Sequence, residues 1–288
     1  MKYMDREGNA YEDSTSQDKL LEFLYTHAVG RLMLKPLVTP AFSNFIGKVL
    51  DSAWSKVLIK PFIKNTGIDM SEYKNTTYSS YNDFFTRKIK SGYRPLAGDN
   101  NTLISPSDGN VTVYPITDKT TFSVKHTEYT LRTLLNSHRL AKRYEGGYAF
   151  IIRLTVEDYH RYCYVADGIK SKNYFIPGSL HTVNPIANDY TPIYKENARE
   201  YTVLHTREFG DIIQMEVGAL MVGKIVNHHE EDEVLRGEEK GYFEFGGSTI
   251  IVFVKKDRVK VREDLLQNTQ NDYETKIHQG DELAVRKN

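Results

Sequence analysis

A glycine pair followed by two hydroxyl residues stands directly before an apolar run near the end of the chain. The segment reads Phe245-Gly246-Gly247-Ser248-Thr249 and continues as Ile250-Ile251-Val252-Phe253-Val254. The β-branched and aromatic run predicts a buried strand, and the glycines allow the backbone to approach a site closely. Ser248 is therefore a candidate nucleophile at the entrance of a strand. The alternative is a plain β-turn whose hydroxyls bond to the local backbone.

A carboxylate in a Pro- and Gly-containing turn is the second candidate. Asp108 lies in Ser105-Pro106-Ser107-Asp108-Gly109. It either caps its own turn or, if buried, orients and stabilises a protonated base beside a hydroxyl nucleophile.

A histidine lies in the segment Asp158-Tyr159-His160-Arg161-Tyr162-Cys163. His160 is a candidate general acid or base. A thiol nucleophile formed by Cys163 with His160 is disfavoured, because positions three apart on a strand point to opposite faces. A metal site at His228-His229-Glu230 is also disfavoured, since adjacent histidines seldom converge on one ion, and we expect no metal.

Two arginines and a further histidine complete the candidates. Arg87 follows the aromatic pair Phe84-Phe85, and Arg94 precedes Pro95. Each is a candidate binder of a substrate carboxylate or phosphate, or else a member of a structural ion pair. His181 lies in Pro177-Gly178-Ser179-Leu180-His181-Thr182-Val183-Asn184.

In their order along the chain, these segments resemble the phosphatidylserine decarboxylases, enzymes that make a pyruvoyl group from an internal serine. The resemblance runs from about residue 81 to 255 and includes the run Val217-Gly218-Ala219-Leu220-Met221-Val222-Gly223-Lys224-Ile225. It implies self-cleavage between Gly247 and Ser248, with Asp108 as the acid of a charge relay and His160 as the group that protonates the substrate.

One position departs from the family pattern Tyr-His-Arg-x-His. Cys163 stands where the second histidine, the general base of the relay, is expected. A neutral thiol is a poor proton acceptor. Three interpretations stay open: His160 serves both steps, another histidine such as His181 replaces the base, or self-processing is lost.

The resemblance further implies a cofactor and partners. The cofactor is a pyruvoyl group derived from Ser248, which forms a Schiff base with the substrate amine. The β chain (1–247) and the α chain (248–288) stay associated. Phosphatidylserine would become phosphatidylethanolamine at an anionic membrane surface, on the cytoplasmic face of the cell membrane, with a homodimer left open. The alternatives are a pyruvoyl decarboxylase of a soluble amino acid and a lipid-binding relic that does not cleave.

Composition limits other functions. Lys+Arg and Asp+Glu both number 38, so the net charge gives no argument for nucleic acid as a partner. The single cysteine excludes an internal disulfide framework. Residues 1–17 form a polar N-terminal tail without a signal-peptide core, and no apolar run is long enough to span a bilayer.

Residues 18–72 are predicted to be helical. Thr39 is a good N-cap before Pro40, and apolar residues then recur at three- and four-residue spacing through Leu58. Between residues 31 and 64 there are six basic residues and one acidic residue. A basic amphipathic region with Phe42, Phe45 and Trp54 fits a membrane interface, or an ordinary helix pair packed on the core.

The pattern alternates after Pro95 and predicts strands. They are expected at 110–114, 121–124, 148–156, 162–165, 201–205, 212–226 with a break near Gly218, and 248–254, with one helix at 129–141. The fold class is therefore α+β: N-terminal amphipathic helices packed on a mostly antiparallel, sandwich- or barrel-like β domain at 73–288.

Overall fold

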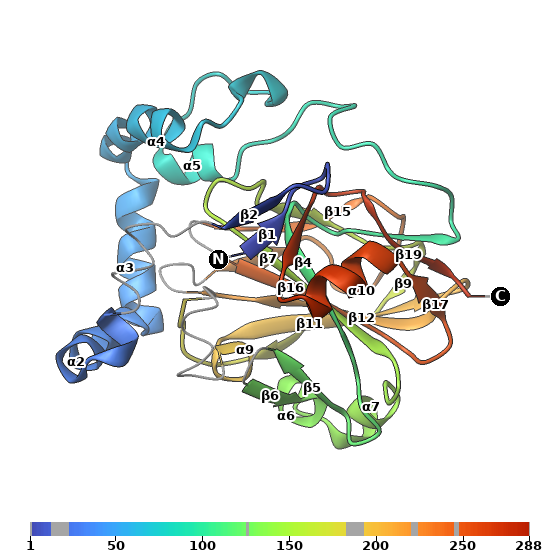
Figure 1. The fold of residues 1–288 in the computed structure, drawn as a ribbon. Helices are drawn as coiled ribbons and strands as arrows, with labels where there is room; N and C mark the ends of the chain where they lie inside the picture. Colours follow the sequence, from blue (N-terminus) through green and yellow to red (C-terminus); the bar gives the residue numbers. More distant parts are fainter. Residues whose placement is uncertain are drawn as a thin grey trace.

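The protein is a mixed α/β structure dominated by one large, mostly antiparallel sheet (Figure 1). This computed structural model describes residues 2–12, 23–124, 127–182, 193–219, 224–244 and 248–287. The strands of the large sheet are β1 (Lys2–Met4), β2 (Ala10–Glu12), β4 (Gly109–Pro115), β7 (Tyr148–Leu154), β9 (Gly168–Lys170), β10 (Tyr174–Ile176), β11 (Arg199–Thr206), β12 (Gly210–Val217), β14 (Asp232–Val234), β16 (Ser248–Val254) and β18 (Glu274–Ile277).

Within the described ranges the sheet has 11 strands in the order β14-β9-β11-β12-β16-β7-β4-β18-β1-β2, with β10 paired to β11. Smaller sheets are formed by β13 (Ile225–Asn227), β15 (Glu239–Phe243) and β8 (Arg161–Cys163); by β17 (Val259–Val261), β19 (Glu282–Arg286) and β3 (Thr102–Ile104); and by β5 (Thr121–Val124) and β6 (Thr127–Thr130).

Strand β16 lies at the centre of the sheet. Every residue of this strand is buried, and it pairs antiparallel with β12 on one side and β7 on the other. Ile251 and Phe253 belong to one hydrophobic core, which we call the Ile251 core, and Ile250, Val252 and Val254 belong to a second, the Ile250 core. Because each such side chain contributes about 1.5–3 kcal/mol when buried, the strand is held firmly on both faces.

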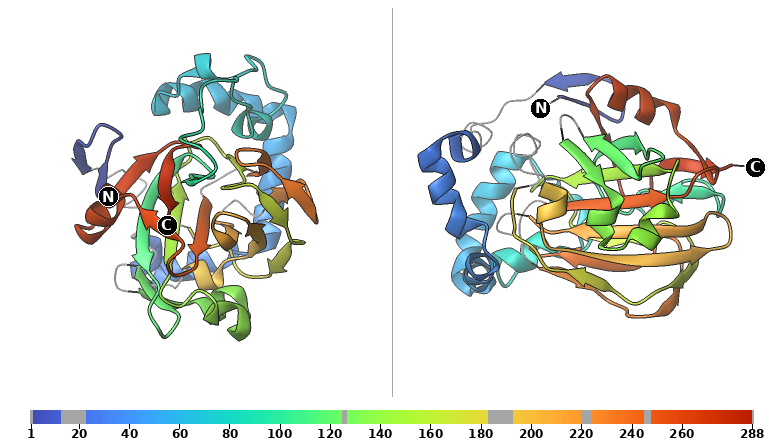
Figure 2. Two further views of the ribbon diagram at one scale, coloured as in Figure 1. Left: turned by 90° about the vertical axis from the view of Figure 1, so that its right-hand side faces the viewer. Right: turned by 90° about the horizontal axis from the view of Figure 1, so that it is seen from below.

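The N-terminal helices lie beside the sheet (Figures 1 and 2). We call residues 23–72 the helical layer; it contains α2 (Ala28–Leu37), α3 (Pro40–Asp51), the 3₁₀ helix η1 (Ala53–Leu58), α4 (Ile59–Thr66) and the 3₁₀ turn η2 (Met70–Glu72). As predicted, Thr39 caps α3, since its hydroxyl accepts a hydrogen bond from the Phe42 N–H. No helix in the described part of the chain is long and apolar enough to cross a membrane.

A short helix joins the helical layer to the rest of the protein. In α5 (Tyr81–Phe85), the side chains of Tyr81, Phe84 and Phe85 are buried and form a small core with Leu50 of α3. Ser80 caps this helix by accepting a hydrogen bond from the Asp83 N–H.

Most predicted strands are confirmed, with ends that differ by at most two residues, and the predicted strand at 212–226 is interrupted after Val217 and resumes as β13. The predicted helix at 129–141 is confirmed only in part. Tyr129 belongs to β6, and the helical residues form α6 (Leu131–Leu135) and α7 (His138–Lys142), because Asn136 takes a left-handed conformation (φ 49°) that ends α6. The remaining helices are α9 (Ile193–Glu196) and α10 (Glu263–Gln270).

Residues 2–12 form a hairpin that extends the large sheet. β1 pairs parallel with β18, and Tyr3 stacks on Tyr11 of β2. The start of the chain thus contacts its last forty residues.

Candidate active site

Ser248 is the first residue of the central strand. Its side chain is fully buried, and its Oγ has no hydrogen-bond partner among the described residues. An unpaired buried hydroxyl is costly, so Ser248 stays a candidate for a functional residue. Gly246 and Gly247 lie outside the described residues.

Three neighbouring strands bring the other candidates to the same end of the sheet. Ser248 pairs with Leu154, the last residue of β7, and Asn110 of β4 pairs with the preceding residue, Arg153. Gly109 therefore adjoins the Leu154 end of β7, with Asp108 just before it. The loop after Leu154 leads to His160.

The backbone at position 109 requires a glycine. Its φ is +149°, and an added Cβ would lie 2.7 Å from the carbonyl oxygen of Arg153. The Asp108-Gly109 sequence thus allows β4 to start close against β7, so that Asp108 is held beside the sheet end.

Asp108 is buried and forms strong hydrogen bonds. Arg94 donates to both carboxylate oxygens, from Nε to Oδ1 at 2.9 Å and from Nη2 to Oδ2 at 2.7 Å, and the Gln279 N–H donates to Oδ1 at 2.8 Å. Arg94 also pairs with Glu72 of η2. Burial alone would lower the pKa of Arg94, but the hydrogen bond and charge of Asp108 outweigh it and raise that pKa. Arg94 therefore forms the ion pair that was the structural alternative for this residue.

His160 is fully buried beside helix α5. Its Nδ1 lies 2.9 Å from the carbonyl oxygen of Asp158, and its ring centroid lies 4.0 Å from that of Phe85. A carbonyl oxygen only accepts hydrogen bonds, so Nδ1 carries the proton and the basic lone pair of the neutral ring is on Nε2.

The backbone of His160 adjoins the side of the sheet to which the Ser248 side chain belongs. Ser248 shares its strand face with Ile250, and the His160 carbonyl accepts a hydrogen bond from the Phe243 N–H. Ile250 and Phe243 are both members of the Ile250 core.

Asp158 anchors the loop that carries His160. Its carboxylate accepts hydrogen bonds from the Thr155 N–H and hydroxyl and pairs with Lys276 at 2.6 Å. Burial would raise the pKa of Asp158, but the Lys276 charge and the Thr155 hydrogen bonds outweigh it and lower the pKa.

Cys163 adjoins the Asp108 loop but is not a base. Its backbone N–H donates to the Pro106 carbonyl, and its buried Sγ lies 3.9 Å from the Ser105 carbonyl oxygen. Burial raises the pKa of this thiol to about 12, so it stays protonated at neutral pH.

His181 lies on the other side of the sheet. Its Nδ1 is 3.1 Å from the hydroxyl of Tyr25, a member of the Ile251 core, and its backbone is bound by Asn197, which also donates to the Gly218 carbonyl. Burial lowers the pKa of His181.

Arg87 is also buried, and its guanidinium donates to the carbonyls of Glu157 and Asp158 at the start of the His160 loop. Its assignment as a substrate ligand stays a prediction.

Three groups near this end of the sheet carried no recognisable sequence signal. Lys240 and Glu216 form a fully buried ion pair at 2.6 Å, and Glu216 pairs across the sheet with Ile250, on the face that Ser248 shares; burial raises the pKa of Glu216. His278 lies in the turn that binds Asp108, and burial lowers its pKa, against the Asp108 charge. Only the register of distant strands brings these residues together.

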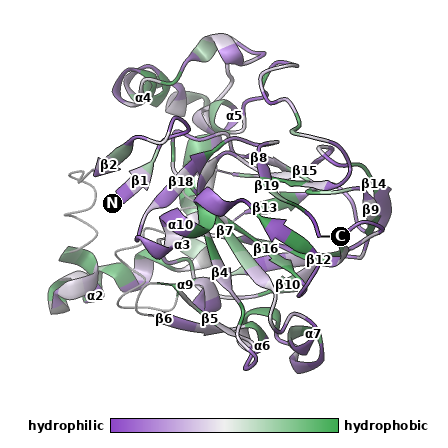
Figure 3. Cartoon of the chain, turned by 45° about the vertical axis from the view of Figure 1, so that its right-hand side comes forward, coloured by the Kyte–Doolittle hydropathy of each residue, from purple (hydrophilic) through white to green (hydrophobic). Residues whose placement is uncertain are grey.

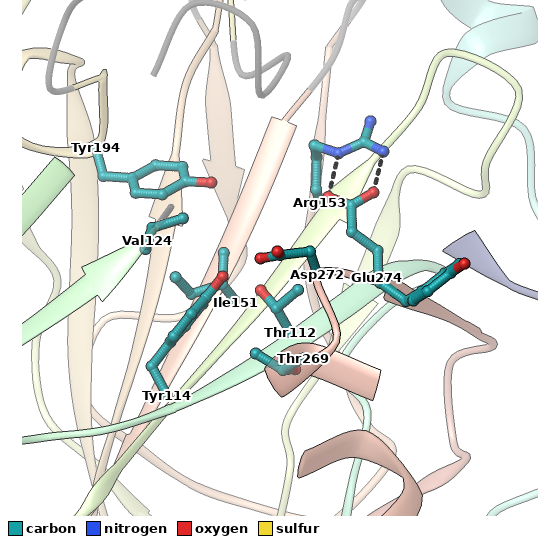
Figure 4. A pocket seen from close by; sticks show the side chains of 10 residues that line it. Thr112, Tyr114, Val124, Ile151, Arg153, Tyr194, Thr269, Asp272 and Glu274 are labelled. Atoms are coloured by element: carbon teal, nitrogen blue, oxygen red, sulfur yellow. Dashed lines mark hydrogen bonds and ion pairs between the residues drawn. The ribbon is translucent and has the colours of Figure 1, made fainter. Parts of the chain in front are cut away.

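A small pocket lies on the opposite face of the sheet (Figure 4). Arg153, which pairs across the strands with Thr249, lines it and forms two hydrogen bonds to Glu274. Tyr194 and Tyr114 supply much of the wall. With its arginine already neutralised, the pocket offers no unpaired charge to an anionic ligand.

A buried serine at the start of a central strand, with a histidine and a carboxylate at the same end of the sheet, is consistent with an enzyme that uses a hydroxyl nucleophile. The sequence model of the phosphatidylserine decarboxylase family matches residues 81–285. The chain is 43% identical to phosphatidylserine decarboxylase proenzyme 2 of Clostridium acetobutylicum, over 95% of this chain and 94% of the relative. It is 40% identical to the proenzyme of Clostridium tetani (99% and 98%) and 37% identical to that of Clostridium botulinum strain 657 (100% of both).

The chain belongs to the phosphatidylserine decarboxylase family. The resemblance drawn from the motifs is confirmed.

Proposed function

We propose that this protein is a proenzyme that cleaves itself before Ser248 and then decarboxylates phosphatidylserine to phosphatidylethanolamine. The observation that carries the proposal is the buried Ser248 Oγ without a partner among the described residues, at the sheet end that His160 and Asp108 share. Family membership and the word proenzyme in the names of the relatives support the same conclusion.

In the self-cleavage, Ser248 Oγ gives its proton to a base and attacks the carbonyl carbon of Gly247. The C–N bond between the two residues breaks and an ester forms. Loss of the Ser248 Cα proton then expels the Gly247 carboxylate and leaves dehydroalanine at position 248. Its imine tautomer is hydrolysed, which releases ammonia and leaves the pyruvoyl group.

We assign the base to His160. Its lone pair is on Nε2, its backbone adjoins the Ser248 side of the sheet, and the Cys163 thiol stays protonated. His181 is bound to Tyr25 on the other side. Asp108, held by Arg94 at the same sheet end, is the carboxylate that would serve as the acid of the charge relay.

The position fits a pyruvoyl group because the hydroxyl from which it derives occupies a buried site and has no competing hydrogen bond from the described part of the chain. The carbonyl of the group supplies an electron-accepting centre for a substrate amine during decarboxylation. The chain's own contribution is to hold position 248 in a buried site and to deliver a proton to the substrate α-carbon from His160.

The fold supports association of the two chains after cleavage. The α chain would contain β16, β17, α10, β18 and β19, and β16 pairs on both sides with strands of the β chain. Breaking the peptide bond before Ser248 removes none of these pairings.

The helical layer supports binding to an anionic membrane at the cytoplasmic face. Trp54, Val57 and Phe45 are 86%, 72% and 62% exposed, and the layer carries Arg31, Lys35, Lys48, Lys56, Lys60 and Lys64. Exposed apolar side chains among basic residues suit insertion beside anionic headgroups. A homodimer stays a prediction.

Intact mass spectrometry under denaturing conditions tests the self-cleavage. We expect chains of 247 and 41 residues (288 − 247), the shorter one with a blocked N-terminus, and a single 288-residue chain for Ser248→Ala. An uncleaved wild-type chain would contradict the proposal and favour a lipid-binding relic.

Release of carbon dioxide from phosphatidylserine vesicles, compared with free serine, tests the substrate. We expect turnover on the vesicles only, and turnover on the free amino acid alone would favour the soluble-substrate alternative.

A further inference from the structure

Arg87 is a buried arginine without a carboxylate partner among the described residues. Its side chain is 2% exposed, and its guanidinium carbon lies 4.4 Å from the ring centroid of Tyr73 and 5.0 Å from that of Phe84. Two aromatic faces therefore stabilise the cation where a counter-ion is missing. Burying a charged guanidinium costs free energy, so its presence at this position calls for a functional reason.

The hydrogen bonds of Arg87 converge on the loop that carries His160. Nη2 donates to the carbonyl of Glu157 at 3.0 Å and to that of Asp158 at 3.3 Å. The same Asp158 carbonyl accepts the hydrogen bond from His160 Nδ1. One backbone oxygen thus joins the guanidinium to the imidazole.

The residues beside Arg87 hold the same loop. The Phe85 ring packs against the His160 ring, and Arg161 Nε donates to the Thr86 carbonyl at 2.7 Å. From the other side, Lys276 and Thr155 hold the Asp158 carboxylate. The Asp158 carbonyl is therefore fixed in one orientation.

We propose that Arg87 is a positioning residue for His160. By holding the Asp158 carbonyl, it keeps His160 in the Nδ1–H tautomer and so keeps the lone pair on Nε2, the atom that the proposed function requires as a base. This inference rests on the proposed function for its catalytic meaning, although the tautomer itself can be observed without any activity.

The competing role for Arg87 is direct binding of a substrate carboxylate or phosphate. Its Nε and Nη1 have no hydrogen-bond partner among the described residues, so they are chemically able to bind an anion. The near-complete burial of the side chain favours positioning. The two roles differ in their effect on kcat and KM.

Nitrogen-15 NMR of the histidine side chains tests the tautomer. The protein carries Ser248→Ala, which keeps the chain uncleaved, and a sample that also carries His160→Gln identifies the His160 signals among the nine histidines. With Arg87 intact we expect protonated Nδ1 and unprotonated Nε2. With Arg87→Met we expect a mixture of tautomers.

Two variants serve as controls. Tyr73→Phe removes only the hydroxyl contact at 3.3 Å and keeps the ring, so the tautomer should not change. Arg87→Lys keeps a donor and a charge but loses the planar stack, so it should retain more of the Nδ1–H tautomer than Arg87→Met does. An unchanged Nδ1–H signature in Arg87→Met would overturn the proposal.

Kinetics of the cleaved enzyme separate the two roles. For Arg87→Met we expect kcat to fall roughly 100-fold, the size of effect that a small misplacement produces, with KM within about twofold of the wild type. A raised KM with unchanged kcat would assign Arg87 to the substrate instead. If the wild-type chain proved inactive while Arg87→Met still altered the tautomer, the positioning would stand and the proposed function would fall.

Discussion

The large sheet and the helical layer differ in how far their apolar side chains are buried. All seven residues of β16 are buried between two cores. By contrast, sixteen large hydrophobic side chains are exposed in the described residues, and nine of them lie in the helical layer. Figure 3 shows hydrophobic segments both in the central strands and along α2.

The difference teaches how far packing within the chain explains each region. The alternating pattern of the strands is satisfied by the protein's own cores. The helical pattern of α3 is satisfied only in part, since Leu50 is buried with Phe84 and Phe85, whereas Phe45 and Val49 face outward. Exposed apolar side chains gathered in one layer fit the membrane-binding surface proposed above.

The largest expected effect lies in the sheet region. His160→Gln should slow self-cleavage at least about 1000-fold, because the residue supplies general base catalysis. Cys163→Ser should leave the rate within about threefold, because the buried thiol is protonated and takes no part. Both rates are measured from the mass of the protein over time after synthesis in a cell-free system.

Equal loss in both variants would mean that Cys163 contributes to the reaction. Rapid cleavage of His160→Gln would remove His160 from the role of base. It would return His181 to consideration and make His278, in the turn that binds Asp108, a new candidate.

The next effect concerns the helical layer. Replacing Phe45, Trp54 and Val57 together by Asp should weaken binding to vesicles with anionic lipids at least about 100-fold, since each inserted side chain contributes about 1.5–3 kcal/mol. Vesicle sedimentation measures it. Self-cleavage should proceed at the wild-type rate, because none of the three side chains lies in the sheet region.

The chain offers a matched control for this experiment. Ile169, Phe175 and Leu235 are also well exposed, at 61–64%, but lie outside the helical layer. Their replacement by Asp should leave vesicle binding unchanged. An equal loss in the control would show that general surface charge, and not the helical layer, determines binding.

Local patterns were sufficient to predict much of the fold and to select the candidate residues of the site. The β-branched runs predicted the strands, and Ser248, Asp108 and His160 were identified by residue type and motif. The helix predicted at 129–141 was confirmed only in part because periodicity does not register the left-handed turn at Asn136 or the strand pairing of Tyr129.

What could not be predicted depends on register between distant segments. The partners of Asp108 are Arg94, 14 residues before it, and Gln279, 171 residues after it. Likewise, Arg87 and His160 meet at a backbone carbonyl, which has no sequence signature. The side of the sheet to which a histidine belongs also appears only in the structure.

A smaller effect tests whether the helical layer unfolds separately from the sheet. Thr39→Ala removes the cap of α3 and should destabilise it by about 1 kcal/mol. Hydrogen exchange of the α3 amides should then become about fivefold faster, while exchange in β16 stays the same. Equal acceleration in β16 would instead show that the two regions unfold as one unit.

The smallest effect is the pH dependence of the contact between the two regions. Tyr25 of the helical layer meets His181 of the sheet region, and burial lowers the pKa of His181 below its ordinary 6.5. As pH falls below 6.5, the unfolded chain binds a proton at this residue before the folded chain does. The free energy of unfolding therefore decreases with falling pH in this window and gains nothing from His181 at higher pH.

His181→Gln should remove this part of the pH dependence. The stability difference between wild type and variant, measured by denaturant unfolding, should be constant above pH 7 and should shrink between pH 6.5 and 5, because only the wild type loses stability to His181 protonation. His278→Gln is the matched control, since burial also lowers the pKa of His278, which lies near Asp108 rather than in the contact with the helical layer. Hydrogen exchange in the helical layer gives a second measurement. If its pH dependence changes in His181→Gln but not in His278→Gln, protonation at this contact loosens that layer. If it changes in neither variant, the layer is held by its apolar contacts alone.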